Sequence, residues 1–150
     1  ANFASGHEYF GLHFDVDHWV FREWAPNASA MFLIGDMSGW QEKEDFALKP
    51  GPEGVWEIHL DPEQLQHTAL FRLLVHWPGG QGDRIPAYAR RVVQDPQSLI
   101  FNAQVWRPES PYQWQCTNFK RTFDAPLIYE VHIGMAQEEN EFQFTIRYQF

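Results

Sequence analysis

Short strand-like runs, broken by turn residues at intervals of about 8–12 positions, constrain the fold of this chain more than any other feature. Residues 55–60 alternate apolar and polar side chains, which predicts a strand with one buried face. Residues 29–35 are apolar on both faces, which predicts a strand buried on both sides, and residues 70–77 form the longest expected strand. Other expected elements are strands at 20–24, 46–49, 84–88 and 98–106, one helical turn at 61–65, and a hairpin loop at 78–83. Because no long amphipathic helix appears, the pattern predicts an all-β antiparallel sandwich over residues 8–106.

The chain changes character after Trp106. Three prolines punctuate the next stretch, which predicts a linker over residues 107–126. Residues 127–134 (LIYEVHIG) are typical of another buried strand, and residues 141–150 alternate strictly, with the apolar side chains on one face. A strand with one apolar face needs a surface to lie on, so a homodimer of the isolated chain is one expected assembly.

The charge of the chain narrows the class of partner. Acidic residues outnumber basic ones, 20 to 11, which gives a formal net charge of −9. Nucleic acid and anionic lipid are bound by clustered Lys and Arg, so neither is an expected partner. Arg84, Arg90 and Arg91 are the nearest approach to a basic cluster. The charge does not exclude a neutral polar ligand. The aromatic content of 17% is more than a small core usually holds, so some rings are expected to face a ligand or another domain.

The single cysteine, Cys116, excludes an internal disulfide and a multi-cysteine zinc site. No run of residues approaches the roughly 18 apolar positions of a membrane span, so no membrane is expected among the partners. The N-terminal residues lack the pattern of a signal peptide and an initiator Met, which suggests a trimmed fragment. Cytoplasm is the expected compartment.

Signatures of catalysis are absent, so no catalytic residue and no cofactor is expected in this chain. One stretch offers a weak alternative: His13, Asp15 and Asp17 would share a face of an extended segment, with His18 beside them, and could hold a divalent metal. A solvated edge or turn explains the same residues more simply. We therefore predict no metal site.

Trp40 closes a loop of small residues, where a large ring has few packing partners. Trp rings stack on the apolar faces of sugar rings while nearby polar groups bind the hydroxyls; the alternative is that Trp40 folds back and caps the sandwich. Arg72 and Trp77 would flank the same surface if strand and loop lie close together. Trp24, Trp56 and Phe71 are expected in the core.

Several stretches resemble one known family. Residues 21–28 (FREWAPNA) are similar to its F-R-x-W-A-P-N-A strand, and residues 33–40 (LIGDMSGW) to its G-D-F-N-x-W loop, with Met37 and Ser38 in place of Phe and Asn. Residues 71–73 resemble its Y-K/R-F strand, and residues 84–95 (RIPAYARRVVQD) resemble a stretch found in branching enzymes. The chain thus resembles the family 48 carbohydrate-binding modules, early-set immunoglobulin-like sandwiches at the N-terminus of glucan branching enzymes and isoamylases.

The resemblance extends to residues 127–134, which look like the first strand of the α-amylase-type barrel. It implies a truncated catalytic barrel over residues 127–150 and a parent 1,4-α-glucan branching enzyme, of bacterial type, whose catalytic carboxylates lie further along the chain. The implied function is to bind or position α-1,4-glucan (glycogen or a maltooligosaccharide), with the ligand-binding residues Trp40, Arg72 and Trp77. Ser38 in place of Asn removes one amide that could bind sugar hydroxyls. The alternative function is a docking domain that stabilises the barrel of its own parent chain without binding sugar.

Overall fold

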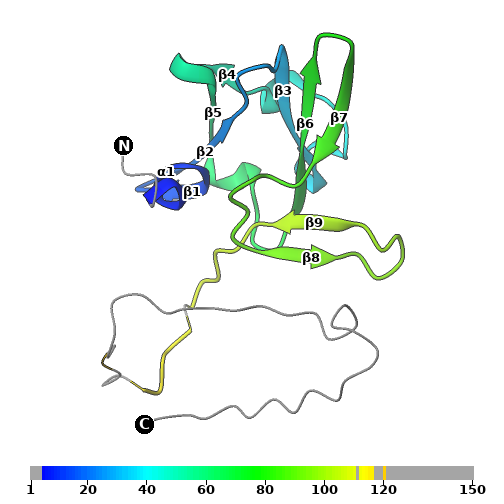
Figure 1. The fold of residues 1–150 in the computed structure, drawn as a ribbon. Helices are drawn as coiled ribbons and strands as arrows, with labels where there is room; N and C mark the ends of the chain where they lie inside the picture. Colours follow the sequence, from blue (N-terminus) through cyan, green and yellow to red (C-terminus); the bar gives the residue numbers. More distant parts are fainter. Residues whose placement is uncertain (1–4, 111, 117–119, 121–150) are drawn as a thin grey trace, which may run out of the picture. The chain divides into compact units, whose positions relative to one another are not determined.

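The computed structural model describes residues 5–110, 112–116 and 120. The chain divides into two units, residues 1–112 and 113–150. All the strands described lie in the first unit and pair antiparallel (Figure 1). The expected strand at residues 127–134 and the tail at 141–150 lie outside the described residues, as does most of the expected linker at 107–126.

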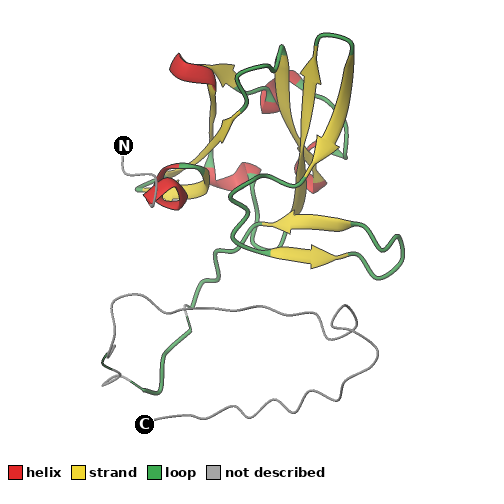
Figure 2. Ribbon diagram, viewed as in Figure 1, coloured by secondary structure: helices red, strands yellow, loops and turns green. Residues whose placement is uncertain are grey.

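Two sheets make up the first unit. One has the order β1 (Gly11–Asp15), β2 (His18–Trp24), β5 (Val55–Leu60), β4 (Lys49–Pro50). The other has the order β3 (Ala30–Gly35), β6 (Leu70–Trp77), β9 (Phe101–Gln104), β8 (Val92–Gln94), with β7 (Gly80–Arg84) also paired to β6. The helical elements are short: α1 (Gly6–Tyr9) and the 3-10 turns η2 (Asp36–Ser38), η3 (Glu44–Phe46), η4 (Pro52–Gly54) and η5 (Pro62–Gln64) (Figure 2). The predicted all-β antiparallel sandwich is confirmed.

The strands with the clearest side-chain patterns form where expected. Residues 55–60 and 70–77 are β5 and β6, and β3 begins one residue later than predicted, at Ala30. Both faces of β3 are buried from Met31 onward, as its apolar pattern requires. The helical turn expected at 61–65 is η5.

Three other strand predictions are wrong or only partly right. Residues 46–49 do not form a strand: a 3-10 turn ends at Phe46, Ala47 makes one isolated bridge to Phe32, and β4 holds only Lys49 and Pro50. β7 starts within the expected loop at 78–83 and ends at Arg84. Residues 85–88, which were expected in a strand, therefore form a loop. The glycines of that segment permit β7 to lie against the Trp77 ring, which a larger side chain at Gly80 would meet at 3.3 Å. The strand expected at 98–106 is shortened to β9.

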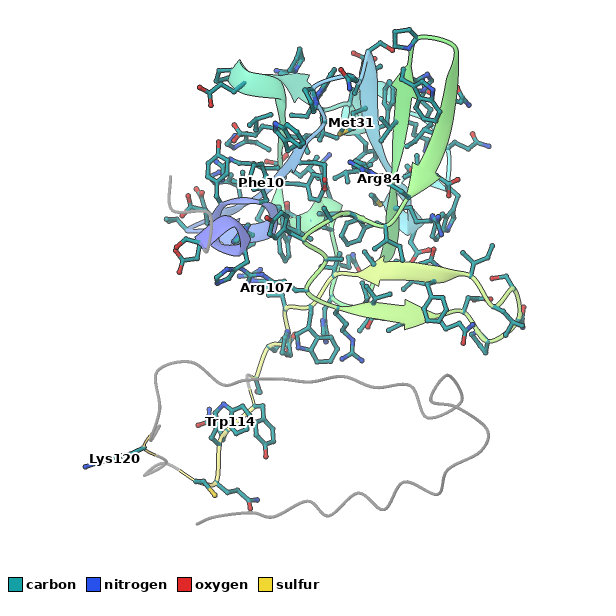
Figure 3. All side chains as sticks on the ribbon, viewed as in Figure 1. Phe10, Met31, Arg84, Arg107, Trp114 and Lys120 are labelled. Atoms are coloured by element: carbon teal, nitrogen blue, oxygen red, sulfur yellow. The ribbon has the colours of Figure 1, made fainter. Side chains whose placement is uncertain are left out.

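The core lies between the inner faces of the two sheets. Leu33 on β3 pairs in register with Leu73 on β6, and both are 0% exposed. Phe21 from the facing sheet meets Phe71 edge to face, with ring centroids 6.3 Å apart. Met31, labelled in Figure 3, is likewise buried in this core. Burial of apolar surface at this interface is the main stabilising contribution to the sandwich.

Trp24 is an exception to the predicted core, because its side chain is 57% exposed. The inward position next to it is held by Glu23, which is 2% exposed. The carboxylate of Glu23 accepts hydrogen bonds from Arg84 Nη2 at 3.2 Å and from the Ala87 N–H at 3.1 Å. Burial raises the pKa of Glu23 above its usual range, against the opposing effect of these two partners. Glu23 thus connects the end of β7 and the segment after it to the first sheet.

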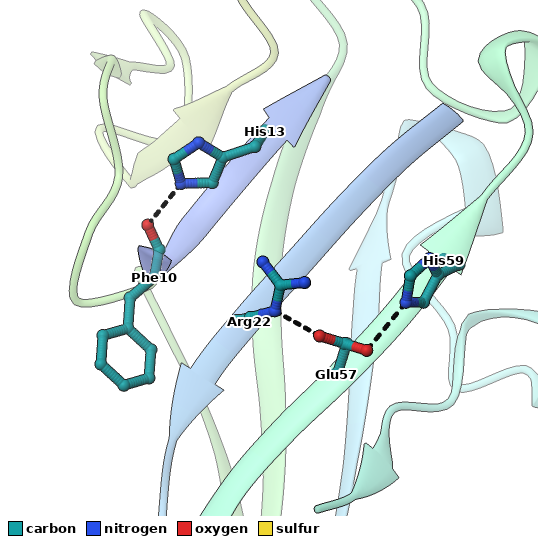
Figure 4. Close-up of polar contacts among 5 residues, drawn as sticks. All are labelled: Phe10, His13, Arg22, Glu57 and His59. Atoms are coloured by element: carbon teal, nitrogen blue, oxygen red, sulfur yellow. Dashed lines mark hydrogen bonds and ion pairs between the residues drawn. The ribbon is translucent and has the colours of Figure 1, made fainter. Parts of the chain in front are cut away.

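The outer face of the first sheet carries paired polar side chains (Figure 4). Glu57 on β5 stands opposite Arg22 on β2 and forms an ion pair with it, while His59 Nε2 lies 2.8 Å from the other carboxylate oxygen. His13, considered above as a metal ligand, contacts the Phe10 carbonyl through Nε2 at 2.8 Å. Over the residues that the structure describes, no three His, Cys, Asp or Glu side chains are grouped closely enough to hold a metal ion. In the same part of the chain, no helix is long and apolar enough to cross a membrane.

Candidate ligand-binding site

The loop that follows β3 begins with a tight turn. A Cβ atom at Gly35 would lie 2.2 Å from the Leu70 carbonyl oxygen, so the close approach of β3 to β6 requires glycine here. Ser38 closes the turn: its Oγ accepts from the Gly35 N–H at 3.1 Å and lies 3.3 Å from the Gly35 carbonyl oxygen. Ser38 is 1% exposed, so its hydroxyl serves the loop and does not face a ligand.

Trp40 stands at the end of this loop in a strained conformation. Its φ of 62° is in the left-handed region, which costs a residue with a side chain about 1–2 kcal/mol. The backbone N–H of Trp40 donates to the Gly35 carbonyl at 2.8 Å, and the indole Nε1 donates to Asp36 Oδ1 at 3.1 Å. The other oxygen of Asp36 accepts from the Leu70 N–H at 2.8 Å. The indole is therefore fixed to the start of β6 while its side chain stays 41% exposed.

Arg72 lies on the outer face of β6 and connects three strands. Its Nη1 donates to the Phe101 carbonyl at 2.9 Å and its Nη2 to the Asp83 carbonyl at 3.3 Å. Nε lies 2.7 Å from Asp83 Oδ2, an ion pair in which the N–H is not aimed at the oxygen, since Nε has no hydrogen-bond partner in the described residues. The side chain is 17% exposed, so the guanidinium is largely committed to the sheet.

Trp40 and Arg72 line one pocket of about 360 Å³. Its other lining residues are Asp36, Leu70, Asp83, Asp95, Ser98, Ile100 and Asn102, of which five have polar side chains. Asp95 is held by the turn between β8 and β9, where its Oδ1 accepts from the Ser98 N–H at 2.6 Å and the Ser98 hydroxyl at 2.8 Å. These bonds from Ser98 lower the pKa of Asp95, so the carboxylate stays ionised.

Asn102 is the most buried polar side chain of this pocket. It is 4% exposed, and its Oδ1 has no hydrogen-bond partner in the described part of the chain. A buried acceptor left unpaired costs about 1–3 kcal/mol. Because Asn102 lines the pocket, a hydroxyl group bound there is a candidate partner for this amide. The pocket therefore combines one exposed aromatic ring with fixed hydrogen-bonding groups, the combination that a neutral polyhydroxyl ligand requires.

The structure does not bring Trp77 to this pocket. Trp77 lies at the far end of β6, paired with Gly80, and lines a second pocket of about 520 Å³ together with Trp24. Trp77 is 44% exposed, with Gly80 and Gly82 packed under its ring. Of the three residues expected at the binding site, Trp40 and Arg72 share a pocket and Trp77 belongs to another.

The contribution of the β8–β9 turn to the pocket was not predicted from the sequence. The segment Asp95-Pro96-Gln97-Ser98 carries the residues of a tight turn, which marks a loop but not the pocket that the loop borders. Asn102 gave no signal at all, because a single Asn within a strand is more often exposed than buried.

Comparison with known proteins identifies a family. Residues 9–97 match the family described as carbohydrate-binding module 48 (isoamylase N-terminal domain). The chain is 35% identical over 147 residues to a 1,4-alpha-glucan-branching enzyme of Rhizophagus irregularis, which covers 91% of this chain and 21% of that protein. It is 34% identical over 149 residues to the enzyme of the same name from Yarrowia lipolytica, covering 93% and 21%. The chain thus spans about a fifth of the length of these curated relatives. A bacterial source stays a prediction.

Solved structures agree on the fold. A putative alpha amylase from Salmonella typhimurium superposes with a TM-score of 0.57 at 16% identity, over 77% of this chain and 17% of that one. Pullulanase type I from Bacillus subtilis, complexed with maltose, gives 0.53 at 18% identity, over 69% and 14%. At these identities the likeness supports the sandwich fold alone. The family match over residues 9–97 covers more than half of the chain. The chain therefore belongs to the carbohydrate-binding module 48 family.

Proposed function

We propose that this chain is the non-catalytic N-terminal module of a 1,4-α-glucan branching enzyme and that it binds α-1,4-glucan chains in the pocket of Trp40 and Arg72. The partners in this proposal are a glucan, such as glycogen or a maltooligosaccharide, and the catalytic barrel of the same parent protein. The parent would cleave an α-1,4 bond and reattach the chain through an α-1,6 bond, using carboxylates outside this chain. The cytoplasm is the proposed compartment.

The position of the Trp40 ring is the observation that carries the proposal. The loop holds Trp40 in a left-handed conformation and fixes its indole with a hydrogen bond, yet leaves the side chain 41% exposed. Strain and an outward-facing ring both act against stability, and strained residues cluster where a ligand is bound. A sugar ring stacked on Trp40 would cover the apolar surface that the fold leaves open.

The polar lining supports a neutral sugar over a charged ligand. The positive charge of Arg72 is offset by the ion pair with Asp83. The carboxylates of Asp36 and Asp95 repel anions but accept hydrogen bonds from hydroxyl groups. Asn102 adds the buried acceptor described above. These groups are spaced around a pocket of about 360 Å³, within the range of small-molecule sites.

The competing proposal is a docking domain that supports the barrel and never binds sugar. One observation favours it: Trp24 and Trp77, 57% and 44% exposed, border the second pocket, and exposed apolar surface of this kind is often covered by another domain. Self-association of the isolated chain, expected from residues 141–150, is a separate prediction that sedimentation velocity would check.

The two proposals are separated by titrating the purified chain with maltoheptaose in a calorimeter. We expect saturable binding that is lost in Trp40→Ala and retained in Trp77→Ala. Trp77 is a matched control, because it is similarly exposed and lies in the other pocket. Loss of binding in Trp77→Ala alone would move the site to the second pocket, and absence of binding by the folded wild-type chain would favour docking.

A further inference from the structure

The arginines of the described residues fall into two groups. Three form ion pairs with carboxylates: Arg22 with Glu57, Arg72 with Asp83, and Arg84 with Glu23. The other three are Arg90, Arg91 and Arg107, and no carboxylate of the described part of the chain pairs with any of them. Acidic residues outnumber basic ones in this chain, which has a formal net charge of −9, so three arginines without an acidic partner are unusual.

All three of these arginines line the same pocket, of about 460 Å³. It lies at the end of the sandwich where the chain leaves β9, near the Arg107 labelled in Figure 3. Phe14 and Trp19 from the first sheet, with Trp106 after β9, supply aromatic walls. Neither Trp40 nor Arg72 borders it, so this pocket is separate from the proposed glucan site.

The guanidinium groups contact aromatic rings and an imidazole ring. Arg107 lies over the Phe14 ring, 3.4 Å from its centroid, and Arg91 lies 4.0 Å from the centroid of Trp106. Arg90 Nη2 is 2.9 Å from His13 Nδ1. Stacking on rings and a contact with an imidazole nitrogen orient these groups, and no carboxylate of the described residues compensates their positive charges.

Trp19 provides a second, independent indication. It is 4% exposed, and its indole Nε1 has no acceptor in the described residues. Arg107 lies 5.9 Å from the Trp19 ring and helps to cover it. Trp19 also lines the pocket, so an acceptor oxygen bound there is a candidate partner for the indole N–H.

We propose that the pocket of Arg90, Arg91 and Arg107 binds a small ligand that carries an oxyanion, a phosphate monoester or a carboxylate, on a compact body such as a sugar ring. The oxyanion would pair with the guanidinium groups and accept from Trp19 Nε1, while Phe14 and Trp106 contact the body of the ligand. Arginine matches carboxylate and phosphate oxygens with paired N–H groups, so both chemistries suit the site. The proposal does not depend on glucan binding at Trp40.

The test is a calorimetric titration of the purified chain, in phosphate-free buffer, with glucose 6-phosphate, with glucuronate and with glucose. We expect at least one of the two acids to bind at millimolar concentration or below, and glucose not to bind at this pocket. The acid that binds more tightly identifies phosphate or carboxylate as the preferred group. If neither acid binds better than glucose, the proposal is wrong.

Variants locate the binding. Arg107→Gln and Arg90→Gln should each raise the Kd of the acid at least about fivefold, because each removes one charge from the pocket. Lys49→Gln removes the same charge from an exposed site outside the pocket and should leave the Kd unchanged. If the Kd of the acid rises equally in all three variants, then the effect comes from the net charge of the chain and the proposal is overturned. Trp40→Ala should leave acid binding intact, so that failure of the glucan site and failure of this site give different results.

Discussion

Replacing Asp36 with Ala tests whether the fold holds the Trp40 ring in place for a ligand. The substitution removes two hydrogen bonds to one carboxylate, from Trp40 Nε1 and from the Leu70 N–H. Asp36 is exposed, so water replaces part of what is lost, and we expect the free energy of unfolding to fall by about 1–2 kcal/mol. In the variant the Trp40 side chain is no longer held in place and must be ordered when glucan binds. This ordering costs about 0.5–1.5 kcal/mol of binding free energy, which corresponds to a roughly 2- to 12-fold rise in the Kd for glucan.

Urea denaturation measures the first quantity, and a maltoheptaose titration the second. Asp36→Asn keeps one acceptor oxygen and should give effects between those of wild type and Asp36→Ala. Asp45→Ala is the matched control, because Asp45 is exposed and its carboxylate makes no hydrogen bond in the described part of the chain. If Asp36→Ala behaves like Asp45→Ala in both assays, then the carboxylate does not position Trp40 and the reasoning fails.

Three further predictions concern stability, each followed by urea or thermal unfolding. Leu33→Ala, at a 0% exposed position of β3, should lower the free energy of unfolding by about 2–5 kcal/mol; a loss below 1 kcal/mol would show that the core is looser than described. Gly35→Ala should cost more than about 2 kcal/mol or prevent folding, because the new Cβ would lie 2.2 Å from the Leu70 carbonyl oxygen; an unchanged melting temperature would contradict this contact. Burial pushes the pKa of Glu57 upward, but its bonds with His59 and Arg22 outweigh this and hold the pKa below its ordinary 4.5, so its contribution to stability is present above about pH 4.5 and is lost as the pH falls below it. Glu57→Gln should therefore show a smaller loss of stability on acidification than wild type, and an identical pH profile would refute the assignment.

The fold could be predicted wherever one strand's own side chains determine its burial. β5 alternates and β3 is apolar throughout, and both form as predicted because the pattern of each strand matches its place in the sandwich. Trp24 shows where such reasoning stops. The inward position beside it is taken by Glu23, which is stabilised there by Arg84 and the Ala87 N–H, partners more than 60 residues away along the chain.

The site was predictable only in part, for a related reason. The loop of Trp40 is local, and its small residues drew attention to the ring, although the sequence left open whether the ring faces a ligand or caps the sandwich. Arg72 reaches the pocket because β3 and β6 are paired neighbours, which places the residue pair Ile34 and Arg72 beside the loop. Asp95 and Asn102 arrive with β8 and β9, whose pairing the sequence did not reveal, and Trp77 is carried away to the opposite end of β6.

The central claim, that glucan binds on Trp40, is tested most directly by the indole N–H signals of the tryptophans in a proton–nitrogen correlation spectrum during a maltoheptaose titration. Assignment by Trp40→Phe, Trp24→Phe and Trp77→Phe identifies the signals of the exposed rings. We predict that the Trp40 signal shifts saturably, because its Nε1 is fixed to Asp36 at the edge of the pocket, while those of Trp24 and Trp77 stay in place. Shifts confined to Trp24 and Trp77, or no shift in any of the three, would contradict the account.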